Sequence, residues 1–161
     1  MPIDKEIEYL ENYIALQKMR FGTAILVLID KKIHDVGFGM SDVGHDLTAK
    51  TGTVRHPTSD IRNAYIEPML LIPFVENAFK HGVGMIRQPI IKIEVLLEDN
   101  RLIFNVLNKF NNASEEEKDF DSGIGLKNVR RRLELVYGAN HTLKAEAEGD
   151  MFVVNLVIDL K

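Results

Sequence analysis

The chain has 161 residues, a formal net charge of −4 at pH 7 and no cysteine, and 45% of its residues are hydrophobic. A chain of this length forms one domain that buries about two-thirds of its unfolded surface, and without cysteine it makes neither disulfides nor thiolate metal sites. The acidic balance disfavours direct nucleic-acid binding, and the sequence has neither a membrane-spanning apolar run nor a signal peptide.

The amino-terminal segment has the spacing of an amphipathic helix. Apolar side chains recur at alternating spacings of four and three over residues 3–21, and Asp4 is suited to cap the helix. Tyr9, Tyr13 and Leu16 make a second apolar edge. The helix is therefore expected to pack on its own domain, with a partner helix on the second edge as the alternative.

A short buried strand is predicted next, over residues 24–29. Residues 31–59 have no sustained period and indicate a long loop. The loop contains His34, His45 and His56, but their spacing matches no metal-ligand pattern, so we interpret them as solvated loop residues.

A short strand over residues 63–66 is expected to lead into a helix. Pro68 suits the first turn of that helix, because its missing N–H needs no partner there. The helix should run to His81 and stop at Gly82. Its positions are almost all apolar apart from a polar cluster of Glu76, Asn77, Lys80 and His81.

This polar cluster favours an active-site helix. Side chains three and four residues apart on a helix are neighbours, and buried polar or charged groups cost several kcal/mol unless they are paired or bound. A metal-bound phosphate would supply such a partner. Pairing of Glu76 with Lys80 is an alternative within the cluster itself.

The next segment predicts a hairpin followed by a polar loop. Residues 91–97 alternate between apolar and polar side chains, Asp99 and Asn100 make a turn, and residues 102–107 form the second strand. Residues 108–122 are polar and charged without an apolar period, which indicates a loop between two structured segments.

The segment DSGIGLKNVRRRLELVYG, residues 121–138, places two glycines directly before a basic helix. Backbone N–H groups beside Gly123 and Gly125, together with the positive end of the helix dipole, suit a phosphate, although a tight loop is an equal alternative. Two strands follow, over 141–147 and 151–158, and complete an α/β two-layer sandwich with a mixed, largely antiparallel sheet. Side-chain donors on the helix are Lys127, Asn128, Arg130 and Arg131, of which Arg130 is expected, like Arg132, to be solvated.

Three segments together resemble a known family. VENAFKHG, GIGLKNVRRRLELVYG and the upstream EIEYLENYIALQKMRFG are similar to the C-terminal part of LytS/YehU-type sensor histidine kinases, whose ATP-binding domains have the Bergerat fold of the GHKL ATPases. The resemblance implies a linker helix over residues 1–22 and a catalytic domain over residues 23–161. Within that domain, residues 31–59 would be an insertion and residues 108–122 the ATP lid.

The resemblance implies ATP and Mg²⁺ as ligands. Asn77 is the expected Mg²⁺ ligand, since this ion needs few protein oxygens beside phosphate and water. Glu76, with Lys80 and His81, is expected on the catalytic side, where it would orient a water or the attacking imidazole. The expected nucleotide contacts are Asn77, Lys80, Asn108, Gly123, Gly125, Leu126, Lys127, Asn128 and Arg131.

Asn108 departs from the wider GHKL pattern. Most of these proteins have an aspartate in a D-x-G-x-G box that accepts a hydrogen bond from the adenine amino group, and here Asn108 stands in that place without the glycines. A neutral acceptor makes a weaker hydrogen bond than a carboxylate. The alternative function is therefore a degenerate regulatory or interaction domain that binds no nucleotide.

The resemblance also implies the partners. The phosphoacceptor segment of such kinases is missing, so this chain is interpreted as a catalytic fragment that acts on a dimerisation region absent from it. The parent would be a homodimer anchored in the inner membrane, with this domain in the cytoplasm and a response regulator, often of the LytTR type, as partner. An ATP-hydrolysing machine of the chaperone or mismatch-repair kind and an anti-sigma-type serine kinase are less favoured alternatives.

Overall fold

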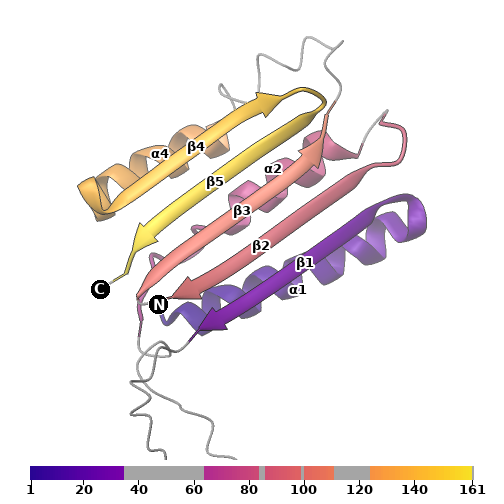
Figure 1. The fold of residues 1–161 in the computed structure, drawn as a ribbon. Coiled ribbons are helices and arrows are strands. Elements are labelled where there is room, and N and C mark those ends of the chain that lie inside the picture. The colour runs from indigo at the N-terminus through magenta and orange to yellow at the C-terminus, as the bar shows by residue number, and fades with distance from the viewer. Residues whose placement is uncertain (35–63, 84–85, 99, 111–123, 161) are drawn as a thin grey trace, which may run out of the picture.

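The structure is a computed structural model that describes residues 1–34, 64–83, 86–98, 100–110 and 124–160. These residues form a five-stranded sheet and three α-helices (Figure 1). The elements are α1 (Ile3–Phe21), β1 (Leu26–His34), α2 (Ile72–Gly82), β2 (Ile90–Glu98), β3 (Arg101–Lys109), α4 (Ile124–Tyr137), β4 (His141–Glu148) and β5 (Met151–Asp159), with 3-10 turns at Gly22–Ala24 and Gly138–Asn140.

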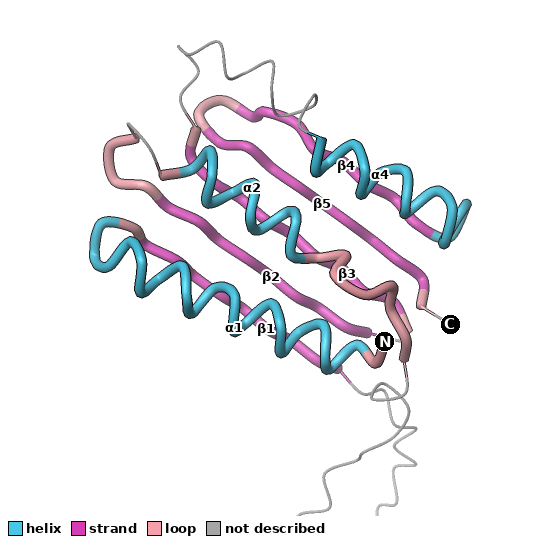
Figure 2. The backbone as a smooth tube through the Cα atoms, turned by 180° about the vertical axis from the view of Figure 1, so that it is seen from behind, coloured by secondary structure: helices cyan, strands magenta, loops and turns pink. Residues whose placement is uncertain are grey.

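The sheet has the strand order β1-β2-β3-β5-β4, in which β1 and β2 are parallel and the other neighbours antiparallel. All three helices cover one face of it, with α2 between α1 and α4 (Figure 2). This arrangement confirms the predicted two-layer α/β sandwich with a mixed, largely antiparallel sheet.

Alternation of side chains builds the core between the two layers. On β2, β3 and β5 every second residue points to the helices and is buried, as expected for strands with one covered face. The other face carries a polar row in which Asn155 donates to Asn105 at 2.6 Å and Asn105 donates to Glu94 at 3.3 Å. A one-residue slip would place these polar groups in the core, so the row helps to fix the register.

The amino-terminal helix packs into this core. Ile3, Ile7, Leu10 and Ile14 are buried, as the period predicted, whereas Tyr9 and Leu16 remain exposed. The expectation that Asp4 caps the helix was wrong. The helix begins at Ile3, one residue before Asp4, and Pro2 occupies the capping position without a side-chain hydrogen bond.

The first strand differs from the prediction in length and burial. β1 runs to His34, beyond the expected end at Asp30 and into the segment interpreted as loop. It lies at the edge of the sheet, and Leu26 and Leu28 lie on the face turned from the helices, beside Ile90 and Lys92. Leu26, Leu28 and Ile29 are between 43% and 52% exposed. An edge strand has a neighbour on one side only, so apolar residues there are not evidence of full burial. The rest of the predicted loop lies outside the described residues.

The segment before α2 also differs. No strand forms over the described residues 64–66, where Tyr65 makes only an isolated bridge with Pro2. The helix begins at Ile72 and includes Pro73 in its first turn, so Pro68 was the wrong proline for its start. The intervening turn contains Met69 with φ of 57°, a left-handed conformation that a helix does not allow.

Candidate functional site

The polar cluster predicted from the sequence lies on α2, in the middle of the helical layer. Glu76 and Lys80 are exposed, whereas Asn77 and His81 are half-buried. Each pair is four residues apart, and neighbouring residues of a helix are rotated by roughly 100° about its axis. The helix therefore presents its four polar side chains as two pairs on different sides.

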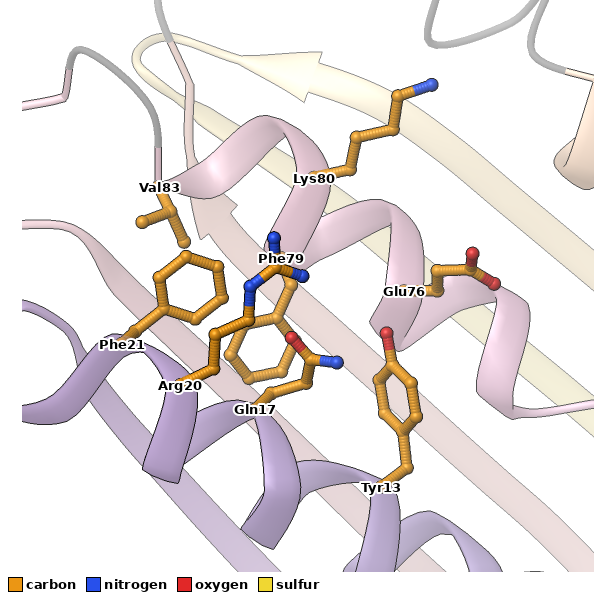
Figure 3. A pocket seen from close by; sticks show the side chains of 8 residues that line it. All are labelled: Tyr13, Gln17, Arg20, Phe21, Glu76, Phe79, Lys80 and Val83. Carbon is orange, nitrogen blue, oxygen red and sulfur yellow. The ribbon is translucent and has the colours of Figure 1, made fainter.

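The first pair faces a groove between α1 and α2 with a volume of about 350 Å³. In Figure 3 the ring of Tyr13 reaches from α1 toward α2, while the Lys80 amino group points away from the α1 side chains. Glu76 and Lys80 form the outer rim, and among the described residues no ion pair joins them. Besides these two residues, the groove is lined by Tyr13, Gln17, Arg20, Phe21, Phe79 and Val83.

Aromatic contacts fix the floor of this groove. Phe79 stacks on Phe21 with ring centroids 5.9 Å apart and meets Tyr13 edge-on at 6.3 Å. The pKa of the Tyr13 hydroxyl is raised, first because burial penalises the phenolate and second because the negative charge of Glu76 is close. Tyr13 therefore stays protonated and is available as a hydrogen-bond donor beside Glu76.

The second pair, Asn77 and His81, is not among the residues that line this groove. Next to them, the end of α2 meets β3 at very short range. A Cβ atom on Gly82 would lie 3.0 Å from the Cβ of Asn108 and 3.2 Å from its amide nitrogen. Only a glycine allows β3 and α2 to approach this closely without a shift.

Asn108 is the polar exception in the helix-facing side of β3. It is 1% exposed, and its Nδ2 donates to the carbonyl of Lys109 at 3.0 Å. Among the described residues, Asn108 and Glu6 are the buried polar or charged side chains of the core. Burying an amide costs free energy unless the amide is hydrogen-bonded, and the bond to the Lys109 carbonyl satisfies the Asn108 nitrogen.

The amino-terminal part of α4 carries the remaining predicted residues. Gly125 lies in the first turn of α4 rather than before it, and an added Cβ there would meet nothing within 4 Å. Leu126 is buried in the core, whereas Lys127, Asn128 and Arg131 are exposed. Gly123 lies outside the described residues.

Sequence reasoning missed three residues that hold the turn before α2. Glu6 accepts hydrogen bonds from the N–H groups of Met69, Leu70 and Leu71. The expectation that Arg132 is solvated was wrong, since it donates to the carbonyls of Pro68 and Met69. The Tyr137 hydroxyl accepts from the N–H of Glu67 at 2.8 Å. No local pattern signals these contacts, because the partners are 63 to 70 residues apart.

Two properties of the described residues bear on ligands and location. They contain no group of three or more His, Cys, Asp or Glu side chains arranged to hold a metal ion. None of the described helices is long and apolar enough to cross a membrane.

Comparison with solved structures identifies the fold. The blue-light activated histidine kinase of Erythrobacter litoralis matches with a TM-score of 0.58 and 17% identity over 99% of this chain, which spans 44% of that kinase. The catalytic domain of histidine kinase ThkA matches with a TM-score of 0.55 and 17% identity over 99% of this chain and 94% of that domain. Histidine kinase AdeS of Acinetobacter baumannii matches with a TM-score of 0.56 and 12% identity, over 100% of this chain and 66% of AdeS.

The chain therefore has the fold of histidine kinase catalytic domains. No family model and no curated protein matches its sequence. The ThkA kinase also matches in a structure where it is bound to the response regulator protein TrrA, with a TM-score of 0.55 and 17% identity over 100% of this chain and 41% of that kinase.

Proposed function

We propose that this chain is the ATP-binding catalytic domain of a sensor histidine kinase of the LytS/YehU type. The observation that carries the proposal is the buried Asn108 beside Gly82, at the end of the helix that carries Asn77 and His81. A buried amide on β3, two half-buried polar side chains on α2 and exposed donors on α4 suit adenine, a metal ion and phosphates in that order. The fold supports the same proposal.

Each residue has a definite task in this proposal. The carbonyl oxygen of Asn108 accepts from the adenine amino group, because its nitrogen is already the donor to Lys109. Asn77 holds Mg²⁺, which supplies positive charge to the phosphate oxygens. Lys127, Asn128 and Arg131, with the N–H groups around Gly123, Gly125 and Leu126, hold the phosphates. His81 and Lys80 are assigned to the phosphates as well, Lys80 through its amino group, which points away from the α1 side chains.

Glu76 is assigned the catalytic side of the site. It stands on the exposed rim of α2, where a histidine of a partner segment has access, and it orients that imidazole through a hydrogen bond. The phosphoryl acceptor is a histidine on a dimerisation region outside this chain. A response regulator then receives the phosphoryl group, and the parent protein is a membrane-anchored homodimer with this domain in the cytoplasm.

The test is calorimetric titration of the chain with a non-hydrolysable ATP analogue and Mg²⁺, beside an Asn77→Ala variant. The proposal predicts saturable binding that depends on Mg²⁺ and is lost in the variant. Strong autophosphorylation of the isolated chain would contradict the assignment of the acceptor to another region. Absence of binding in both proteins would favour the second candidate, a nucleotide-free regulatory domain, which the replacement of aspartate by Asn108 supports.

A further inference from the structure

The side chain of Glu6 is fully buried and reaches from α1 to the start of α2. Its Oε1 accepts from the N–H groups of Leu70 at 2.8 Å and Leu71 at 2.9 Å, and its Oε2 accepts from Met69 at 2.9 Å. Leu71 is the residue directly before α2 and has no side-chain cap of its own. The carboxylate of Glu6 thus binds the three N–H groups that precede α2 and places a negative charge beside the amino terminus of that helix.

The same turn is held from the opposite side by α4. Arg132 donates to the carbonyls of Pro68 and Met69 and pairs with Glu67 at 3.2 Å. Met69 therefore has its N–H bound by α1 and its carbonyl bound by α4. Its left-handed φ of 57° is unfavourable for a residue other than glycine, and such a conformation persists only where the surroundings fix it.

We infer that Glu6 is a positioning residue that couples the placement of α1 to the placement of Asn77 and His81 on α2. The reason is mechanical. Leu70 and Leu71 are fully buried, so their N–H groups find no water if the carboxylate is lost, and an unsatisfied buried N–H group is unfavourable. The turn must then move, and α2 moves with it, because a helix shifts as a rigid element.

The consequence for the site rests on the proposed function. A displacement of α1 changes where Glu6 holds the amino terminus of α2, and so changes the distance between Asn77 on α2 and the phosphate-binding residues on α4. A signal that arrives through α1 would in this way adjust the affinity for nucleotide. The groove between α1 and α2 would change shape in the same movement.

The test compares Glu6→Gln with Glu8→Gln, the same chemical change two residues later on α1. Glu8 is exposed and pairs with Lys5 only on the surface. Glutamine at position 6 keeps one acceptor oxygen but turns an NH₂ group toward an N–H donor, so at least one of three hydrogen bonds is lost. Both variants are studied in the whole chain, in buffer where circular dichroism shows them to be folded.

Two readouts distinguish positioning from stability alone. The first is the amide ¹H–¹⁵N shifts of Asn77 and His81 without ligand, and the second is the affinity for a non-hydrolysable ATP analogue with Mg²⁺. We expect Glu6→Gln to move both amide signals and to weaken binding by roughly tenfold, whereas Glu8→Gln changes neither. Wild-type shifts and wild-type affinity in folded Glu6→Gln would overturn the inference.

The two readouts also keep the inference separate from the proposed function. If the wild-type chain binds no nucleotide, the proposed function fails, and the amide shifts alone decide whether Glu6 positions α2. If Glu6→Gln does not fold, Arg132→Gln loosens the same turn from α4 and must move the same amide signals. Unchanged signals in a folded Arg132→Gln variant would then overturn the inference.

Discussion

Gly82 at the end of α2 lies directly against the side chain of Asn108 on β3, where an added Cβ atom would be only 3.0 Å from the Cβ of Asn108. This contact lies where the structure buries its one helix-facing asparagine among the described strand residues. Under the proposed function, a shift of α2 relative to β3 would change the surroundings of the amide assigned to adenine.

Gly82→Ala should lower both stability and nucleotide affinity. The new methyl group would lie 3.0 Å from the Cβ of Asn108, and overpacking of this kind costs about 1–3 kcal/mol, more than the gain of up to about 1 kcal/mol in helix propensity. Urea unfolding without ligand measures the effect. Gly125→Ala is the matched control, since its Cβ would meet open space and should leave stability equal or higher. If Gly82→Ala and Gly125→Ala changed the unfolding free energy equally, the close contact between Gly82 and Asn108 would be contradicted.

Asn108→Asp should strengthen nucleotide binding and weaken the unliganded fold. A carboxylate makes a hydrogen bond about twice as strong as a neutral acceptor to the adenine amino group. Without ligand, the buried charge loses the bond from Nδ2 to the Lys109 carbonyl and meets that oxygen with like polarity. Calorimetry and urea unfolding measure the two effects separately. An affinity unchanged from that of the wild type would remove Asn108 from the adenine contact.

Tyr137→Phe should destabilise the chain by about 1–2 kcal/mol. The change keeps the ring, which is 8% exposed, but removes the acceptor of the Glu67 N–H. The position of the turn before α2 should change as well, and hydrogen exchange at the Glu67 amide reports that directly. Tyr65→Phe serves as the control, because Tyr65 is 61% exposed. A Tyr137→Phe variant as stable as this control would show that the hydrogen bond contributes nothing.

Glu94 should make a small, pH-dependent contribution to stability. Its pKa is lowered from 4.5, chiefly by the hydrogen bond from Lys92 and further by Asn105, against an opposing effect of burial. A group with a lowered folded pKa stabilises above its unfolded pKa and loses that contribution as pH falls through the folded value. The side chain is 33% exposed, so the contribution is at most about 1 kcal/mol.

The measurement is the difference in unfolding free energy between the wild type and Glu94→Gln, followed from pH 7 downward. The difference should be present at pH 7 and should disappear well below pH 4.5, the unfolded value. Glu148→Gln, an exposed change on β4, controls for the general loss of a charge. If the difference in unfolding free energy between the wild type and Glu94→Gln increased as the pH falls, a lowered pKa of Glu94 would be contradicted.

Sequence patterns predicted the helices and strands whose formation depends on residues close together in the sequence. The alternation over β2 and the period of α1 are properties of neighbouring residues, and the structure confirms both. Gly138, with φ of 51°, ends α4 where a left-handed residue was needed. No local sequence pattern predicts the parallel pairing of β1 with β2. This pairing places β1 at the edge of the sheet, where the strand is partly exposed.

Long-range contacts explain what the sequence did not predict. Pro68 resembles a helix start, but Glu6 and Arg132 hold the residues after it in a turn, and α2 begins only at Ile72. An acidic residue in an amphipathic helix normally faces solvent, so nothing near Glu6 in the sequence indicated its burial. The predicted site residues that the structure describes lie on α2, β3 and α4, while Gly123 lies outside the described residues.

The proposed nucleotide site lies between α2, the end of β3 and the start of α4. Titration of the ¹⁵N-labelled chain with a non-hydrolysable ATP analogue and Mg²⁺ tests that location directly. Saturable changes in amide chemical shift are expected at Asn77, His81, Asn108 and the first turn of α4. The amide shift of Asn155, on the opposite face of the sheet, should not change. Shifts confined to the groove between α1 and α2, or to the open face of the sheet, would contradict the account.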